Sequence, residues 1–191
     1  MIEVSDASAK APAKSEASAK IGVLFVCYAN ICRSPLAEGT FRWLAERRGV
    51  LDRLTIASAG TSAMDGAPPH SLSQAIAAEH GFMLEGESQQ LVRDDLSRYD
   101  HVIVMDRQNL ATIQRLTGSA FGPLASANPE RVGFRARVRL LRELADPGAS
   151  GADLDVPDPI GRGPDHYRAV FGLIERGCAA LVDELFGPQA G

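Results

Sequence analysis

The stretch VLFVCYANICRSP, residues 23–35, runs from four apolar residues directly into a cysteine. The apolar run 21–26 is typical of a buried strand in a parallel sheet. Pro35 then favours the first turn of a helix, which we expect to end near Gly49. Ligands of parallel α/β folds bind at the carboxyl ends of the strands. The sequence therefore places Cys27 at the edge of the sheet where such folds build their sites.

Strands and helices alternate along the rest of the chain. Further strands are predicted at 54–60, 101–106 and 134–141, and helices at 35–49, 70–80, 93–98, 107–116 and 166–186. Segments 117–133 and 146–165 are rich in Gly, Pro and short polar residues, which predicts irregular structure. This alternation indicates an α/β fold with a parallel sheet covered by helices on both faces.

Length and composition indicate a single domain. The chain has 191 residues, 45% of them hydrophobic, which suits one domain with its own core. We expect residues 21–187 to form this domain and 188–191 to be a short tail. Residues 1–20 are rich in Ala, Ser, Lys and Glu and are expected to be a disordered tail.

Charge and cysteine content limit the functional class. A net charge of -4 argues against a nucleic-acid-binding protein. No apolar run approaches the ~20 residues of a membrane span, and the N-terminus lacks the apolar segment of a secretory signal. The three cysteines form no CxxC pair and the four histidines are scattered, so we expect no metal site and no disulfide framework. These features favour a cytoplasmic protein with no membrane partner.

The loop from Cys27 to Ser34 contains the residue types of an oxyanion site. Between a strand end and a helix N-terminus, backbone N–H groups can converge on an anion. The same groups would stabilise the thiolate of Cys27 and make it a nucleophile, with a hydrogen bond from Ser34. Arg33 can offer two parallel N–H groups to two oxygens of a tetrahedral anion. Asn30 can adopt left-handed backbone angles and brace the loop with its amide.

A cysteine at this position can also have a purely structural role. A cysteine at a strand end is usually a small buried hydrophobe, and a Cys-x5-Arg spacing by itself is common. Here the pair stands between an apolar strand and a helix that begins near a proline, with Asn30 and Ser34 in the same loop. This context favours the catalytic interpretation.

Several stretches resemble one enzyme family. VLFVCYANICRSPLAEGTFR (23–42) resembles the phosphate-binding loop and first helix of the low-molecular-weight protein tyrosine phosphatases. SAGTS (58–62), VIVMDRQNL (102–110) and VPDPIG (156–161) resemble the family's second strand end, third strand and acid loop. The resemblance covers roughly residues 21–187. It implies a four-stranded parallel sheet, a two-step reaction through a cysteinyl phosphate without metal or cofactor, and phosphotyrosine-containing proteins or peptides as substrates.

The resemblance also implies roles for individual residues. Cys27 would be the nucleophile, Arg33 the phosphate clamp and Asp158 the general acid, with Ser58 supporting Asn30. The expected substrate-binding residues are Tyr28, Ala29, Asn30, Ile31, Cys32, Ser34, Met64 and Ile160. From the residues alone, Asp153, Asp155 and Asp165 are alternative acids, because all lie in the same Pro- and Gly-rich segment. The resemblance further suggests that Cys27 and Cys32 can form a reversible disulfide.

The chain departs from the family pattern around the loop. Ala29 stands where many relatives have glycine. Gly86 and Gln89 stand where relatives usually have a histidine and an arginine, so Gln89 or Gln90 could replace that brace.

The expected pocket walls differ as well. Met64 and Ile160 stand where eukaryotic-type relatives have aromatic residues, which leaves Tyr28 as the main aromatic wall. A pocket with so few aromatic walls also admits small phosphoesters.

Three alternatives to a tyrosine phosphatase follow from the same motif. A thiol-dependent arsenate reductase needs resolving cysteines, but residues 84–100 contain none and Cys178 is expected to face the core. Phosphoarginine phosphatases of this family carry threonine where this chain has Ile31. A non-enzymatic phosphate-binding module would not require Cys27, Arg33 and Asp158 together.

Overall fold

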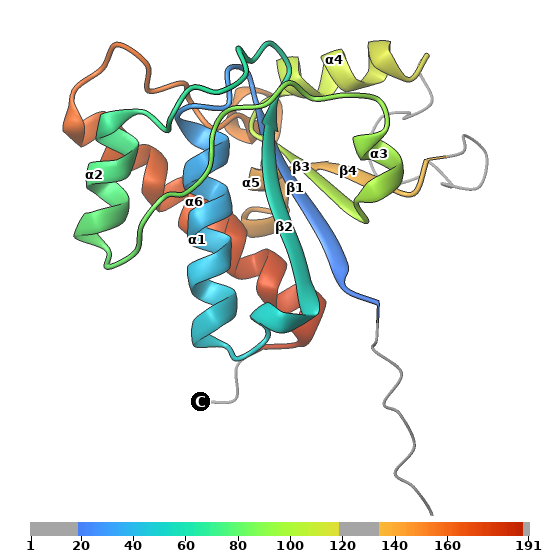
Figure 1. Ribbon diagram of the computed structural model, residues 1–191, viewed down its shortest axis with the longest axis horizontal. Helices are drawn as coiled ribbons and strands as arrows, with labels where there is room; N and C mark the ends of the chain where they lie inside the picture. Colours follow the sequence, from blue (N-terminus) through green and yellow to red (C-terminus); the bar gives the residue numbers. More distant parts are fainter. Residues whose placement is uncertain (1–18, 119–133, 189–191) are drawn as a thin grey trace, which may run out of the picture.

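The computed structural model describes residues 19–118 and 134–188 (Figure 1). Four parallel strands form one sheet in the order β2-β1-β3-β4. The strands are β1 (Ile21–Cys27), β2 (Leu54–Gly60), β3 (His101–Val104) and β4 (Arg137–Leu140). This confirms the predicted α/β class and its four-stranded parallel sheet. The expected tails at 1–20 and 188–191 and the irregular segment 117–133 lie almost entirely outside the described residues.

Six α-helices and two short 3-10 helices are described. They are α1 (Arg33–Arg47), α2 (Ser71–Glu79), α3 (Asp95–Arg98), α4 (Arg107–Leu116), α5 (Leu141–Ala145) and α6 (Pro164–Phe186), with 3-10 turns at Leu51–Arg53 and Gly151–Leu154. The expected helices are therefore present, with ends shifted by a few residues.

Three boundaries differ from the prediction. The predicted strand 134–141 is shorter, and α5 follows it directly without having been expected. The predicted strand 101–106 ends at Val104 because Asp106 caps α4, exchanging hydrogen bonds with Asn109 in a capping box. The last helix begins two residues earlier than predicted, with Pro164 at its first turn, where proline is favoured.

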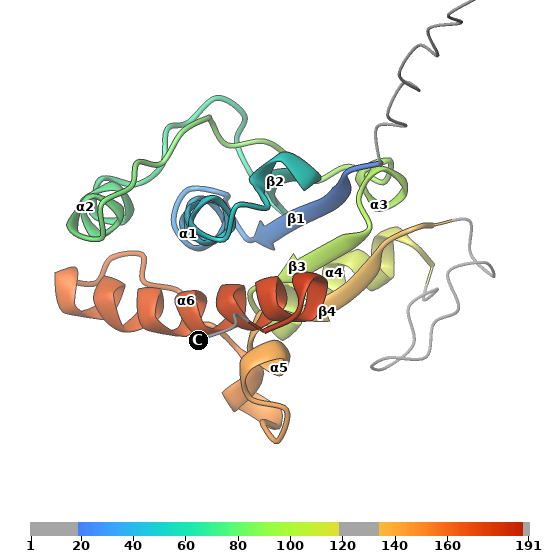
Figure 2. The same cartoon turned by 90° about the horizontal axis from the view of Figure 1, so that it is seen from below.

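Side chains of β1 alternate between two cores, which explains its continuous apolar sequence. Val23, Phe25 and Cys27 belong to the core formed with α1, α2 and α6. Leu24 and Val26 belong to the core that includes residues of α3 and α4. Figure 2 shows α1 and α6 along one face of the sheet and α3 and α4 along the other. Burial on both faces is typical of a parallel sheet.

The last helix packs tightly against its neighbours. As predicted, one face of α6 is buried, including Phe171, Ile174, Cys178 and Leu181. A Cβ atom on Gly177 would lie 2.5 Å from Cγ of Leu141, so glycine allows α5 to approach α6. Among the described residues, no helix is long and apolar enough to cross a membrane.

The order of the strands determines where the site lies. β1 occupies the middle of the sheet, with β2 on one side and β3 on the other. The chain therefore leaves the carboxyl end of β1 at the point where the direction of winding reverses, which is where open α/β sheets bind ligands. Cys27 is the last residue of β1, and α1 begins only six residues later, at Arg33.

Candidate active site

The loop between β1 and α1 encloses the thiol of Cys27. Cys27 is 3% exposed, and its sulfur lies 3.0 Å from Oγ of Ser34. The backbone N–H of Asn30 donates to the same sulfur over 3.3 Å. Asn30 has a φ of 56°, and it is the one non-glycine residue with positive φ in the described part of the chain. This confirms the predicted left-handed turn at Asn30, which bends the loop around the sulfur.

Beneath the loop, the side chain of Asn30 joins three segments. Its Nδ2 donates to Oγ of Ser34 and to Oγ of Ser58, both over 2.9 Å. Its Oδ1 accepts from the backbone N–H of Gln89 over 2.9 Å, and Nε2 of Gln89 donates to the carbonyl of Ser58. Gln90 instead bonds the turn after β2, through the backbone of residues 61 and 63. Gln89 is therefore the brace of the loop, which the sequence left undecided between the two glutamines.

The end of β2 also supports the loop by close backbone approach. A Cβ atom on Gly60 would lie 2.7 Å from the carbonyl oxygen of Tyr28. Thr61 and Ser62 donate backbone hydrogen bonds to the carbonyls of Cys27 and Tyr28. A glycine at this position is therefore required for the loop to rest on β2.

The guanidinium of Arg33 holds two carboxylates. Its Nη1 donates to Oδ2 of Asp106 over 2.7 Å and to the carbonyl of Val156 over 3.0 Å. Its Nη2 donates to Oδ2 of Asp158 over 2.9 Å. Arg33 is 3% exposed, so both ion pairs lie at a nearly buried cation. Asp106 was not among the predicted site residues, although its position just beyond β3, at the same edge of the sheet as Cys27, indicates a place in the site.

The structure separates the four candidate acids. Asp158 lies against Arg33 and lines the same cavity as Cys27. Asp155 accepts four hydrogen bonds from Arg107, and this pairing lowers the pKa of Asp155. Asp165 pairs with Arg168 in the first turn of α6, and Asp153 is exposed in a 3-10 turn.

A cavity of about 220 Å³ opens above the sulfur of Cys27. The residues that line it are Cys27, Tyr28, Ala29, Ile31, Cys32, Arg33, Asp158 and Ile160. Tyr28 is 55% exposed and Ile160 is 50% exposed, so both present apolar surface at the mouth. The cavity thus brings together most of the residues that the resemblance implied.

Three of the expected substrate-binding residues do not line this cavity. Met64 is 84% exposed, because the turn that carries it is tied to Ser88 and projects its side chain into solvent. Asn30 and Ser34 are almost fully buried beneath the loop, so they support it from behind. Asn30 and Ser34 thus lie where supports of the loop would be expected, and the side chain of Met64 lies apart from the cavity.

The two remaining thiols have different surroundings. Cys32 is 4% exposed and lies 3.4 Å from the hydroxyl of Tyr167, and burial raises the pKa of Cys32. Cys178 is fully buried against the carbonyl of Ala37, as predicted, and burial raises its pKa as well.

A buried thiol in a loop between a parallel strand and a helix, facing an arginine and a carboxylate across one cavity, is the arrangement of a cysteine-dependent phosphatase. The family described as "Low molecular weight phosphotyrosine protein phosphatase" matches residues 22–188 of this chain. The chain belongs to this family and is a cysteine-dependent phosphatase.

Individual relatives agree with this assignment. A low molecular weight protein-tyrosine-phosphatase of Streptomyces coelicolor is 37% identical over 163 residues, which is 84% of this chain and 90% of the relative. The crystal structure of YfkJ from Bacillus subtilis superposes with a TM-score of 0.72 at 31% identity, covering 88% of this chain and 96% of that one. The YwlE arginine phosphatase, as a mutant with a phosphorylated active-site serine, gives a TM-score of 0.72 at 27% identity, covering 86% of this chain and 95% of that one.

Proposed function

We propose that the chain hydrolyses phosphotyrosine in proteins and peptides through a phosphorylated Cys27. The thiolate of Cys27 attacks phosphorus, the ester oxygen departs, and that oxygen takes a proton from Asp158. Water then gives a proton back to Asp158 and attacks the phosphorus, releasing phosphate and the thiolate. The hydroxyl of Ser34, 3.0 Å from the sulfur, stabilises that departing thiolate. The observation that carries the proposal is that Cys27, Arg33 and Asp158 line one cavity.

In the free protein the ion pair with Arg33 occupies the carboxylate of Asp158, which must be released before Asp158 can act as the acid. A phosphate group that enters the loop replaces Asp158 as the hydrogen-bonding partner of the Arg33 guanidinium. The carboxylate then faces a dianion instead of a cation, which favours its neutral, protonated form. Substrate binding therefore creates the acid that the first step needs.

The mouth of the cavity favours an aromatic leaving group. Tyr28 and Ile160, each about half exposed, present apolar surface on which the ring of a phosphotyrosine can pack. The cavity is open enough to accept small phosphoesters as well. The family's activity on phosphorylated proteins is consistent with this mouth.

Phosphoarginine is the second candidate substrate, supported by the similarity to the YwlE arginine phosphatase. Ile31 lines the cavity of Cys27 and has no hydroxyl to bond a guanidinium group. A buried polar group without a partner costs free energy, so Ile31 disfavours phosphoarginine. We therefore place phosphotyrosine first.

The reduced state of the thiol also indicates where the enzyme acts. The three cysteines are all free, and the mechanism requires Cys27 to stay reduced. Reducing compartments preserve such thiols, so we propose that the enzyme acts in the cytoplasm.

The test compares a phosphotyrosine peptide with a phosphoarginine peptide of the same sequence. Wild-type protein should hydrolyse the first at least tenfold faster, Cys27→Ser should hydrolyse neither, and the matched control Cys178→Ser should retain activity. Faster release of phosphate from the phosphoarginine peptide would reverse the order of the two substrates. Activity of Cys27→Ser on either peptide would disprove the proposed nucleophile.

A further inference from the structure

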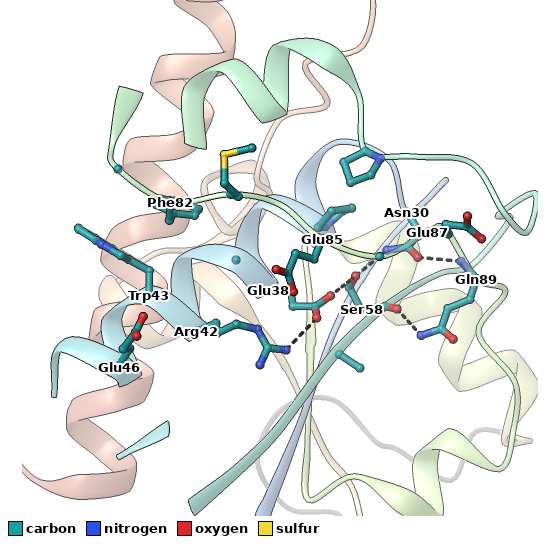
Figure 3. A pocket seen from close by; sticks show the side chains of 17 residues that line it. Asn30, Glu38, Arg42, Trp43, Glu46, Ser58, Phe82, Glu85, Glu87 and Gln89 are labelled. Atoms are coloured by element: carbon teal, nitrogen blue, oxygen red, sulfur yellow. Dashed lines mark hydrogen bonds and ion pairs between the residues drawn. The ribbon is translucent and has the colours of Figure 1, made fainter. Parts of the chain in front are cut away.

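A second cavity, of about 600 Å³, lies behind the loop, and Glu38 lines it (Figure 3). Glu38 stands on α1 one turn after Ser34. Its Oε2 accepts a hydrogen bond from Oγ of Ser58 over 2.8 Å, and its Oε1 accepts one from Arg42 over 3.3 Å. The side chain of Glu38 is 21% exposed. Glu38 thus connects the second cavity to Ser58, and through Ser58 to the loop.

The chemistry of the groups determines which one donates and which one accepts in each hydrogen bond of this connection. An ionised carboxylate only accepts, so Ser58 must donate its single hydroxyl hydrogen to Glu38. Oγ of Ser58 is then left to accept from Nδ2 of Asn30, over 2.9 Å. The Oδ1 of Asn30 faces the backbone N–H of Gln89, so the amide group of Asn30 is not reversed.

The same order of donors and acceptors continues from Asn30 through Ser34 to the sulfur of Cys27. The second hydrogen on Nδ2 of Asn30 goes to Oγ of Ser34 over 2.9 Å, so Ser34 accepts there and keeps its own hydrogen to donate. Two acceptors lie within reach of that hydrogen, the sulfur of Cys27 at 3.0 Å and the carbonyl of Ala59 at 3.3 Å. The shorter contact and the negative charge of a thiolate favour Cys27.

We propose that Glu38 is a positioning residue for the phosphatase reaction, whose carboxylate sets the direction of the hydrogen-bond chain Glu38–Ser58–Asn30–Ser34 that ends on the sulfur of Cys27. The inference rests on the proposed role of Cys27. Glu38 touches neither the cavity of Cys27 nor a phosphate group within it, so it acts only through Ser58.

The charge of Glu38 and its role as a hydrogen-bond acceptor have opposite effects on the stability of the Cys27 thiolate. A negative charge near the loop disfavours the thiolate through space, whereas a fixed acceptor favours it by directing Ser34 toward the sulfur. Burial raises the pKa of Glu38 above its ordinary value, although the hydrogen bonds from Ser58 and Arg42 oppose this shift. Two more carboxylates, Glu46 and Glu87, line the same cavity. Substitutions that separate charge from acceptor therefore test the inference.

The experiment uses Glu38→Gln and Glu38→Leu, with Glu46→Leu as the matched control. Glu46 lines the same cavity from the same helix, near Trp43 and away from Ser58 (Figure 3). For each protein, kcat and KM are measured on an activated aryl phosphate. The thiolate fraction is measured as the rate of iodoacetate alkylation at about pH 6 relative to about pH 9, values that bracket the ordinary range of a thiol.

Loss of the Glu38 carboxylate as an acceptor should slow the chemical steps of the reaction. Glu38→Leu should lower kcat about five- to tenfold with KM changed less than about twofold, since a misdirected hydrogen bond to a charged sulfur is lost only in part. The thiolate fraction should fall with it. Glu38→Gln, whose amide oxygen still accepts from Ser58, should keep at least about half of the wild-type kcat. Glu46→Leu should match wild type in all three quantities.

Coupling to Ser58 completes the test and remains informative if Glu38→Leu folds poorly. Ser58→Ala should show the same loss as Glu38→Leu, and Glu38→Leu in the Ser58→Ala background should cause no further loss. Thermal unfolding of each variant identifies a folding defect. Equal losses in Glu38→Gln and Glu38→Leu, a wild-type kcat in Glu38→Leu, or independent effects of Glu38 and Ser58 would each overturn the inference. Loss of activity in a folded Glu46→Leu variant would also overturn the inference. None of these outcomes affects the assignment of Cys27 as the nucleophile.

Discussion

Nη2 of Arg33 donates to Oδ2 of Asp158 over 2.9 Å, so the proposed phosphate clamp and the proposed acid bind each other. The pair cannot persist during catalysis, because Arg33 needs its fork for phosphate and Asp158 needs a proton. Exchange of the carboxylate for phosphate frees the guanidinium of Arg33 and releases the carboxylate of Asp158, which then takes a proton from water. Asp158 is suited to move, since its side chain is 43% exposed while that of Arg33 is 4% exposed.

The role of Asp158 predicts a dependence on the leaving group. A tyrosine phenolate has a conjugate acid of pKa ~10 and leaves poorly without a proton. Asp158→Asn should therefore slow hydrolysis of a phosphotyrosine peptide by ~10²-fold or more, as for other lost general acids. An aryl phosphate with an electron-poor leaving group should be slowed much less. The measurement is kcat on both substrates.

Asp155→Asn is the matched control for this prediction, because Asp155 lies three residues away and pairs with Arg107. It should slow both substrates equally or not at all. If Asp155→Asn or Asp165→Asn, rather than Asp158→Asn, showed the leaving-group dependence, Asp158 would be the wrong acid.

Oxidation should join Cys27 to Cys32. Peroxide converts the thiolate of Cys27 to a sulfenic acid, and the sulfur of Cys32 then attacks it with loss of water to form a disulfide. Mass spectrometry after brief peroxide treatment should detect the bridge, and a thiol reductant should restore activity. In Cys32→Ser the same treatment should proceed to the irreversible sulfinic and sulfonic acids. Irreversible oxidation of Cys27 in the wild type, with Cys32 still a free thiol, would contradict the prediction.

A side chain at position 60 should displace the loop. Gly60→Ala would place Cβ 2.7 Å from the carbonyl of Tyr28 and 2.9 Å from Cβ of Ala63, closer than real contacts allow. We expect a loss of stability of about 1–3 kcal/mol and a fall in kcat, because the loop must shift away from β2. Denaturant unfolding and phosphatase assays measure the two effects. Gly172→Ala, whose added Cβ would meet nothing closer than 4.0 Å, is the control and should retain full activity.

Stability should fall with pH below neutrality because of His101. This histidine is 8% exposed on β3, and burial lowers its pKa. Its folded pKa therefore lies below its unfolded value, so the unfolded chain takes up the proton first as the pH falls, and the free energy of unfolding decreases. His101→Leu should reduce this decrease between about pH 7 and pH 5, as measured by denaturant unfolding. An unchanged slope in the variant would show that other groups cause it.

The sequence by itself determined the strand–loop–helix unit around Cys27. An apolar run, a loop with a left-handed Asn30 and a helix beginning at Arg33 depend on local preferences of neighbouring residues, so they can be predicted from a short stretch. The alternation of strands and helices gave the fold class for the same reason. Even so, α5 was missed, because five residues carry too little periodicity to reveal a helix.

The sequence indicated Asp158 and Ser58 only through the family resemblance, and tertiary structure decided how these and other distant residues meet at the site. Asp106 and Asp158 meet at Arg33 from positions 73 and 125 residues away in the sequence. Glu38, Ser58 and Gln89 form the support of Asn30 from three different segments. Met64, by contrast, was expected at the pocket and turned to solvent. Hydrogen bonds and ion pairs between remote segments depend on how strands and helices pack, and local sequence preferences do not specify which distant side chains that packing brings into contact.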